Sequence, residues 1–376
     1  MKIAYILPHF YPYVGGGEKM FYDLAVGFKK AGHEVHVVAR DVKPDYVGLC
    51  RIDGVSVNYR PWKEMFGHPF PVKEDIEEEI KWCDVVHTSI FTTSPIVSKL
   101  AKKYGKPSVL TIYEVRGNKW FACDNFFKAC IYYMVEQYTC RQKFSAYHAI
   151  SEATKRDIKQ YCDRPNVHRV YLANEMKKDA YNTEFSLRGY FGLKNDTPVF
   201  LYYGRPGRTK GIQVYARAIE RIIGRLKVNT DFRFCFILGK EPEKERKEFI
   251  KYIKAKKLDE YVLIRDSVER EQLSECIKQA NCVVVPSLTE GFGFSALEAC
   301  QLGTSIIYSD GGSLPEVTFG LCRSFKNGDA VDLSEKLLKV IKGEADAFGY
   351  VPEKDFSYDN VMRGIMDIYR RVSGVE

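Results

Sequence analysis

Short apolar runs recur along the chain and alternate with segments whose apolar residues follow a helical period. In the first half, the runs with the character of buried strands cover residues 2–7, 34–39, 55–60, 84–88, 107–113, 145–150 and 167–171. In the second half they cover residues 198–203, 232–238, 261–265, 282–286 and 304–308. Between them, residues such as Leu24, Ala25 and Phe28 recur at helical spacing. Alternating strands and helices indicate parallel sheets covered on both faces, so we predict an α/β protein.

The length of the chain indicates two domains rather than one. A chain of 376 residues is long for a single hydrophobic core and suits two α/β domains. We predict one Rossmann-like domain over residues 1–174, a second over residues 175–355, and a closing helical segment over residues 356–376. The eleven cysteines show no paired C-x-x-C spacing, so we expect neither a zinc site nor a secreted disulfide framework.

Two glutamates are the first candidates for chemistry. Glu290 and Glu298, with seven residues between them, span a Gly-rich turn that follows a predicted strand and leads into a helix. Such a turn opens at the carboxyl edge of a sheet, where open α/β folds bind ligands. The backbone N–H groups of Gly293, Phe294 and Ser295 begin the helix and suit an anion. Carboxylates beside an anion site fit a ligand with both hydroxyls and phosphates, such as a nucleotide sugar.

Two basic residues form a second candidate site. Arg205 and Lys210 lie among glycines in the loop between the predicted strand at 198–203 and the predicted helix at 213–225. Two cations fixed in such a loop can bind a diphosphate and stabilise the negative charge that grows on a leaving group. Solvated surface residues are the alternative interpretation of this pair.

A glycine run forms the third candidate loop. Gly15, Gly16, Gly17 and Glu18 follow the first predicted strand and precede a helix. The run opens a βαβ unit, but it does not match the G-x-G-x-x-G dinucleotide fingerprint.

Together, the three loops resemble the E-x7-E, G-R-x-x-x-x-K-G and G-G-x-E elements of the retaining glycosyltransferases with the GT-B fold, and of glycosyltransferase family 4 in particular. The resemblance implies two Rossmann-like domains facing across a cleft, with the acceptor on the N-terminal side and the last helix crossing back to the N-terminal domain. It also implies that Arg205 and Lys210 grip the donor diphosphate. In the same way, it assigns Glu290 to the donor sugar and Glu298 to the ribose.

The resemblance implies a UDP- or GDP-sugar as donor substrate, with no cofactor and no metal site. Glu290, Arg205 and Lys210 are the expected catalytic residues. The expected donor-binding residues are Gly16, Gly17, Arg205, Lys210, Glu290, Phe292, Gly293, Phe294, Ser295 and Glu298.

Four further residues are expected near the cleft. Tyr113 stands where many family members carry a histidine, and a tyrosine is no base near neutral pH. His87 ends a predicted strand and is equally well interpreted as a structural residue. Ser151 opens a helix as its N-cap and by resemblance lines the cleft, while Val268 lies in a segment expected to face the base.

Most of the net positive charge lies in the first half of the chain, where the resemblance places the acceptor. Residues 1–174 hold 25 Lys and Arg against 19 Asp and Glu, so they carry six of the eight net positive charges. Within this half, residues 119–143 combine aromatic residues with flanking lysines and arginines. This pattern suits peripheral contact with an anionic membrane. The alternative is an ordinary helix that buries Phe127, Ile131 and Met134.

We therefore expect a retaining glycosyltransferase that moves a sugar to a hydroxyl of a glycan or lipid-linked glycan. Two alternatives stay open, a nucleotide-sugar 2-epimerase on the same fold and a catalytically silent donor-binding or scaffold subunit. The predicted first strand begins at Lys2, so we expect no signal peptide. We expect a cytoplasmic protein, peripheral on the cytoplasmic face of a membrane, and no nucleic-acid partner.

Overall fold

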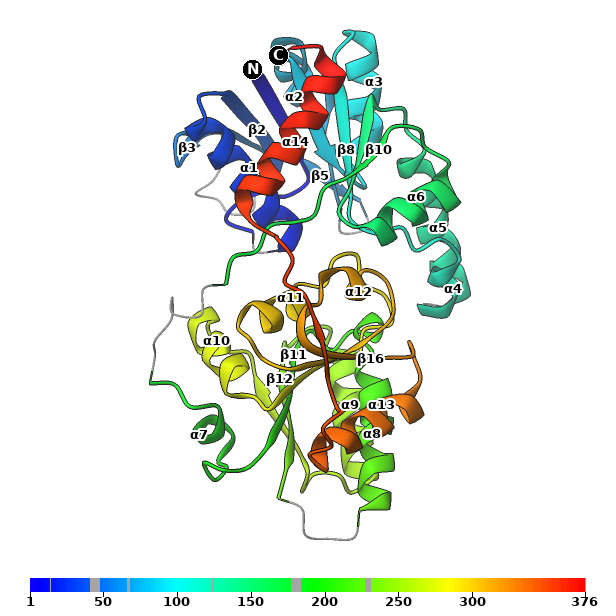
Figure 1. The fold of residues 1–376 in the computed structure, drawn as a ribbon. Coiled ribbons are helices and arrows are strands. Elements are labelled where there is room, and N and C mark those ends of the chain that lie inside the picture. The colour runs from blue at the N-terminus through cyan, green and yellow to red at the C-terminus, as the bar shows by residue number, and fades with distance from the viewer. Residues whose placement is uncertain are drawn as a thin grey trace. The chain divides into compact units, whose positions relative to one another are not determined.

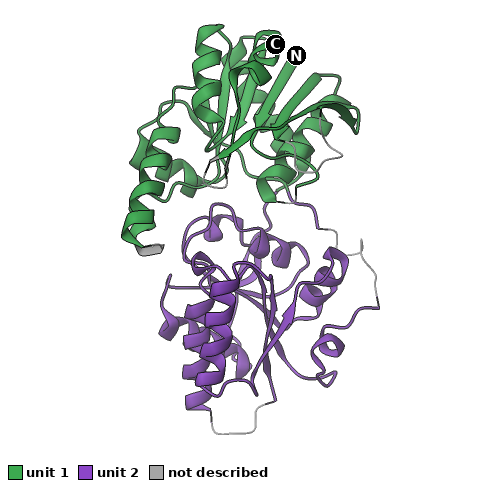
Figure 2. Ribbon diagram, turned by 180° about the vertical axis from the view of Figure 1, so that it is seen from behind, with its two compact units in different colours: residues 1–173, 356–376 green, residues 174–355 purple. Residues whose placement is uncertain are grey.

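The computed structural model describes residues 1–13, 15–40, 48–65, 68–123, 125–176, 184–226 and 231–375. The chain forms two compact units, which Figure 2 shows in green and purple. Unit 1 consists of Met1–Ala173 and Phe356–Glu376, and unit 2 consists of Asn174–Asp355. The last segment of the chain thus belongs to the same unit as the first.

Unit 1 is built on an eight-stranded sheet of order β10-β9-β8-β7-β1-β2-β4-β3, in which only β3 is antiparallel. Helices flank the sheet (Figure 1). Its strands are β1 (Lys2–Leu7), β2 (Glu34–Arg40), β3 (Gly48–Ile52), β4 (Val55–Arg60), β7 (Val85–Ser89), β8 (Ser108–Ile112), β9 (Ala146–Ala149) and β10 (Val167–Arg169), with a separate hairpin of β5 (Lys63–Met65) and β6 (His68–Phe70). Its helices are α1 (Gly16–Lys30), α2 (Lys73–Trp82), α3 (Ser94–Lys103), η1 (Gly117–Lys119), α4 (Trp120–Cys123), α5 (Phe126–Cys140), α6 (Glu152–Cys162) and α14 (Tyr358–Ser373).

Helix α14 packs onto unit 1 because one of its faces is apolar. Ile365, Met366 and Tyr369 of this face are buried. The helix lies against α1 and β7. The hydroxyl of Tyr369 donates to the hydroxyl of Tyr5 on the central strand β1 at 3.1 Å. The last helix therefore closes the core of unit 1.

Unit 2 has a seven-stranded sheet of order β13-β12-β11-β14-β15-β16-β17, parallel except for β17. Its strands are β11 (Val199–Gly204), β12 (Arg233–Leu238), β13 (Val262–Asp266), β14 (Cys282–Val285), β15 (Ile306–Ser309), β16 (Gly320–Phe325) and β17 (Gly349–Val351). Its helices are α7 (Leu187–Phe191), η2 (Arg208–Lys210), α8 (Ile212–Arg225), α9 (Glu243–Ala255), α10 (Arg270–Gln279), α11 (Phe294–Gln301), α12 (Leu314–Val317) and α13 (Ala330–Ile341).

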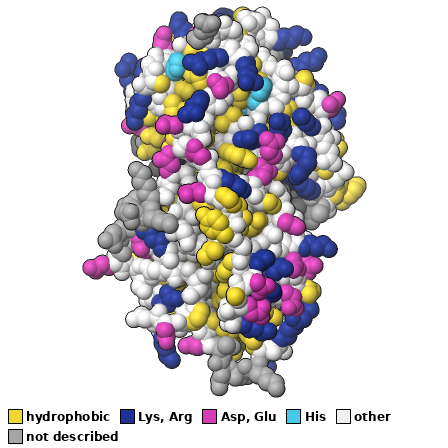
Figure 3. Space-filling model, in the orientation of Figure 1, with side chains coloured by type: hydrophobic (Ala, Val, Ile, Leu, Met, Phe, Trp, Pro, Cys, Tyr) yellow, Lys and Arg dark blue, Asp and Glu magenta, His cyan; other side chains and the backbone are white. Residues whose placement is uncertain are grey.

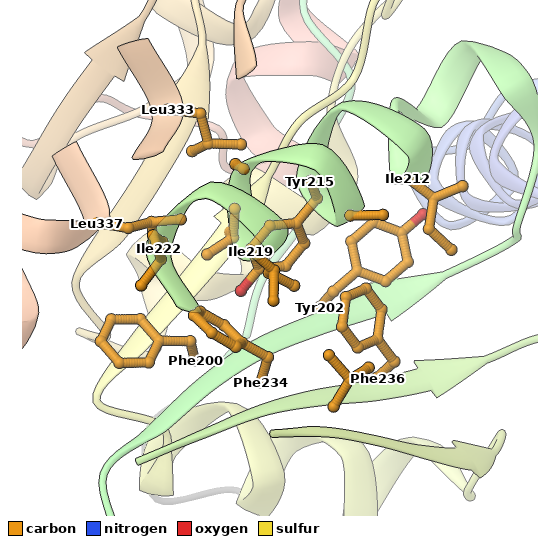
Figure 4. Packing of buried hydrophobic residues seen from close by; sticks show 14 of the residues in the cluster. Phe200, Tyr202, Ile212, Tyr215, Ile219, Ile222, Phe234, Phe236, Leu333 and Leu337 are labelled. Atoms are coloured by element: carbon orange, nitrogen blue, oxygen red, sulfur yellow. The ribbon is translucent and has the colours of Figure 1, made fainter. Parts of the chain in front are cut away.

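Helix α8 forms much of the core of unit 2. Figure 4 shows Tyr215 and Ile219 of this helix directed at Phe234 of β12, and all three side chains are fully buried. Burying apolar side chains of this size contributes roughly 1.5 to 3 kcal/mol each. This packing fixes α8, and with it the loop that joins β11 to α8.

The order of the second sheet sets the position of the site. β11 pairs with β14 in parallel, although 77 residues separate the end of β11 at Gly204 from the start of β14 at Cys282. The loops that follow these two strands therefore leave the same sheet edge side by side. Those loops carry the two candidate motifs of unit 2.

Candidate active site

Backbone hydrogen bonds join the two loops of unit 2. The carbonyl of Thr209 accepts from the backbone N–H groups of Leu288, at 2.8 Å, and Thr289, at 3.4 Å. Gly211 also presses against the second loop, since a Cβ built on it would lie 1.7 Å from the carbonyl oxygen of Pro286. Its φ of +68° suits glycine as well. The loops are thus one rigid assembly.

This assembly brings Lys210 and Glu290 together. Lys210 Nζ donates to Glu290 Oε1 at 2.9 Å and to Oε2 at 2.8 Å. The side chains are 28% and 13% exposed, respectively. The pair is therefore partly desolvated and still open to a ligand, and the ammonium has an anionic partner in Glu290.

A cavity of about 220 Å³ lies beside this pair. Among the residues predicted to bind the donor, Arg205, Lys210 and Ser295 line it. Arg205 is exposed at the end of β11, and Ser295 lies in the first turn of α11. The N–H groups of a first helical turn have no partner within the helix and attract anions. Two cations and a helix N-terminus therefore border one cavity, as a diphosphate requires.

The loop that carries Glu290 is clamped by residues that the sequence analysis did not single out. Ser313 donates its hydroxyl to the carbonyls of Glu290, at 3.0 Å, and Phe292, at 2.7 Å. A Cβ on Gly312 would lie 2.4 Å from the Glu290 carbonyl oxygen, so this position requires glycine. In the sequence, the signal for this contact is the pair Gly311 and Gly312, which follows the predicted strand at 304–308. Gly293, with a φ of +99°, is the N-cap of α11.

Glu298 is one turn into α11 and does not itself line the cavity. Tyr203 does line the cavity, and it links the cavity to α11 because its hydroxyl donates to the Ser295 carbonyl at 2.6 Å. Burial raises the pKa of Glu298, while the charge of Arg270 and a hydrogen bond with Tyr203 act in the opposite direction. Sequence reasoning missed Arg270, which begins α10 two residues after Val268.

Unit 1 has a cavity of its own, of about 220 Å³, at the carboxyl ends of its strands. His9, Glu18 and Tyr113 are among the residues that line it. Gly17 packs against Tyr113, because a Cβ there would lie 2.5 Å from Tyr113 Cζ. Gly16 begins α1 beside it. Burial raises the pKa of Glu18 and of Tyr113, so the tyrosine stays a neutral hydrogen-bonding group.

His87 and Ser151 are both fully buried within unit 1. His87 is fully buried, and its ring nitrogens hydrogen-bond with Tyr369 Oη at 2.6 Å and Thr111 Oγ1 at 2.7 Å. These contacts favour the structural interpretation of this histidine. Ser151 is the predicted N-cap of α6, but it is also fully buried, and its hydroxyl accepts from the Thr154 N–H at 3.0 Å. Both side chains use their polar atoms within unit 1.

The sequence of the chain matches the models of two known protein families. The model of the family described as Glycosyltransferase Family 4 matches residues 14–173, and that of Glycosyl transferases group 1 matches residues 186–350. The chain belongs to glycosyltransferase family 4. The two matches cover both units, including all three predicted loops.

Relatives of this family 4 glycosyltransferase span its whole length. An uncharacterized glycosyltransferase of Methanocaldococcus jannaschii is 24% identical over 394 residues, with 98% of each chain covered. The GDP-mannose:cellobiosyl-diphosphopolyprenol alpha-mannosyltransferase of Xanthomonas oryzae is 24% identical over 322 residues, covering 82% of this chain and 79% of that protein.

A solved structure shows the fold of this glycosyltransferase. The Anabaena protein HepE, in complex with UDP and glucose, superposes with a TM-score of 0.68 at 15% identity, covering 99% of this chain and 95% of that one. The predicted α/β class, GT-B fold and family are confirmed.

Proposed function

We propose that this glycosyltransferase moves a sugar, with retention, from a UDP- or GDP-sugar to a hydroxyl of a glycan or lipid-linked glycan. The observation that carries the proposal is the cavity of unit 2, bordered by Arg205, Lys210 and the first turn of α11. Relatives support the substrate class, since HepE was solved with UDP and glucose and the Xanthomonas enzyme's name specifies GDP-mannose and a diphosphopolyprenol acceptor.

The chemistry needs a cationic site for the leaving group. The bond between the sugar C1 and the diphosphate oxygen breaks, and a bond from C1 to the acceptor oxygen forms on the same face. The acceptor proton passes to a diphosphate oxygen, and the nucleoside diphosphate leaves. Arg205 and Lys210 neutralise the charge that develops on it, with the α11 N-terminus beside them. Glu290 positions the sugar hydroxyls and Glu298 the ribose.

On the acceptor side, we assign Tyr113 to the cavity of unit 1, while Gly16 and Gly17 belong to the proposed donor contacts. Tyr113, a neutral hydrogen-bond donor there, orients a hydroxyl rather than removing its proton. Phe292 and Val268 complete the proposed donor contacts. The protein acts in the cytoplasm, on the cytoplasmic face of a membrane.

A thermal-shift screen with UDP, GDP, ADP and their sugar conjugates tests the donor site. Saturation at a hundred times the dissociation constant adds about 2.7 kcal/mol of stability, so the expected result is a shift with one nucleotide. Lys210→Ala should abolish the shift. The exposed Lys251 of α9 provides the control, and Lys251→Ala should keep it.

A binding shift alone does not show catalysis, so the second experiment measures turnover of the donor that binds. Release of nucleoside diphosphate from the identified donor, lost in Lys210→Ala, would support transfer, and the anomeric proton coupling of the product would report retention. Binding without turnover on any acceptor would favour the silent subunit. Conversion of the donor into its 2-epimer without an acceptor would favour the epimerase.

A further inference from the structure

The outer face of α5 is apolar although it is exposed. Phe127, Ile131, Met134 and Tyr138, here named the α5 stripe, follow each other at i, i+4, i+7 and i+11 and therefore share one side of the helix. Phe127 is 82% exposed, and all four are more than half exposed. At 1.5 Å per residue the stripe runs about 16 Å. The alternative in which Phe127, Ile131 and Met134 face the core is wrong.

The inner face of the same helix is polar, and it fixes the helix in this orientation. The buried carboxylate of Glu136 accepts from the backbone N–H groups of Arg116, at 2.9 Å, and Gly117, at 2.8 Å, and from Trp120 Nε1 at 3.1 Å. Turning the stripe inward would expose Glu136 and break these three bonds. The exposure of the stripe is therefore a stable feature of unit 1.

Basic residues flank the stripe at both ends of α5. Lys128 projects from the first turn of α5, and Arg141 and Lys143 follow its last turn, all three exposed. The only carboxylate of α5 is the buried Glu136. Figure 3 shows Lys and Arg side chains on one face of unit 1, together with hydrophobic side chains and with Asp and Glu. The surroundings of the stripe thus favour an anionic partner.

We propose that the α5 stripe docks on an anionic lipid bilayer, with α5 lying in the plane of the interface. Its aromatic and aliphatic side chains would enter the boundary between headgroups and acyl chains, and Lys128, Arg141 and Lys143 would contact acidic headgroups. A second copy of the chain fits this face less well, because pairing two stripes brings like charges together. Among the described residues, no helix has the length and apolar character needed to span a membrane.

The position of the stripe in the fold fits a membrane-bound acceptor. Tyr113 lines the cavity of unit 1, and only 12 residues separate it from Phe126 at the start of α5. Glu136 ties that connection to the helix through Arg116 and Gly117. Docking of α5 would therefore hold the cavity near the lipid surface. Membrane docking itself does not depend on the proposed sugar transfer.

Vesicle flotation tests the proposal with the full chain. The vesicles are phosphatidylcholine alone or phosphatidylcholine mixed with phosphatidylglycerol. We expect binding to the anionic vesicles, at least tenfold above the neutral ones and weakened by salt. The triple variant Phe127→Ser/Ile131→Ser/Met134→Ser should lose at least tenfold of this binding. The charge variant Lys128→Gln/Arg141→Gln should lose severalfold and become less sensitive to salt.

A matched control removes exposed apolar groups elsewhere. Leu321 and Tyr350, on β16 and β17 of unit 2, are 51% and 73% exposed, and Leu321→Ser/Tyr350→Ser should float like the wild type. An unchanged melting temperature would show that the triple variant folds. Three results would overturn the proposal: a wild type that does not float, a control that loses binding equally, or a dimer that depends on the stripe without any binding to vesicles.

Discussion

The contact between Lys210 and Glu290 predicts a substitution in the candidate active site that strengthens binding. Lys210 Nζ contacts both carboxylate oxygens of Glu290. A nucleoside diphosphate must therefore compete with Glu290 for the ammonium. Glu290→Gln keeps the shape of the side chain and removes its charge. We expect this variant to bind the nucleoside diphosphate more tightly than the wild type, and to transfer sugar more slowly.

The size of the gain follows from the exposure of the pair. Hydrogen bonds between charged groups contribute about 1.5 to 3 kcal/mol when they are well protected. The side chains are 28% and 13% exposed, so screening by water reduces this to about 1 to 2 kcal/mol. The corresponding change in dissociation constant is roughly 5- to 30-fold. The nucleotide sugar should gain less, because it also loses the proposed contact between Glu290 and its hydroxyls.

Isothermal titration of each variant, with the nucleoside diphosphate and with its sugar conjugate, measures both effects. The control is Glu245→Gln, because Glu245 pairs with Arg208 of the same loop at 3.8 Å but does not contact Lys210. It should bind both ligands like the wild type. If Glu290→Gln instead weakens the nucleoside diphosphate and the sugar conjugate by the same factor, then Glu290 does not compete for Lys210 and the reasoning is refuted.

Three further predictions concern stability and pH. Gly211→Ala should destabilise unit 2 by about 3 kcal/mol or more, seen as a lower urea midpoint, because the new Cβ meets the Pro286 carbonyl at a positive φ. Burial lowers the pKa of His148 to about 4 from its ordinary 6.5, so the unfolded chain binds more protons between these pH values. Stability should fall by about 3 kcal/mol as the pH drops through that window, and calorimetry on His148→Gln should show a flatter dependence. Burial raises the pKa of Glu298, so donor affinity should weaken on acidification at a higher pH than an ordinary glutamate allows. In Glu298→Gln, titrations across pH should find weaker binding without that dependence.

The fold was predictable because its central strands are almost entirely apolar. Each of the twelve predicted strands corresponds to a strand of the structure, with ends that agree to within two residues. The strands that were not predicted are β3, the β5–β6 hairpin, β16 and β17. Of these strands, β3 and β17 lie at sheet edges and β16 lies next to β17, and they alternate or expose their residues, as Leu49 and Tyr350 show. Edge strands are stabilised by their neighbours, which a local pattern does not reveal.

The donor loops were predictable as motifs but not as an assembly. Residue types and spacing indicated Lys210 and Glu290, 80 residues apart. Their contact depends on the pairing of β11 with β14 and on the bonds from Leu288 and Thr289 to the Thr209 carbonyl. The clamp formed by Ser313 lies further along the chain. A sequence shows which groups suit a phosphate, whereas sheet order decides which of them meet.

Helix α5 shows a different limit of the sequence pattern. The spacing of Phe127, Ile131 and Met134 correctly predicts a shared face, but it does not say whether that face is turned inward. The inward face was decided by Glu136, whose carboxylate satisfies backbone N–H groups of a loop that precedes the helix by about ten residues. Each exposed apolar side chain then forgoes roughly 1.5 to 3 kcal/mol of burial energy. That energy is recovered only when a partner covers the exposed side chains. Because the buried Glu136 carboxylate holds the apolar face outward, the amphipathic pattern of α5 indicates a binding surface rather than a core face.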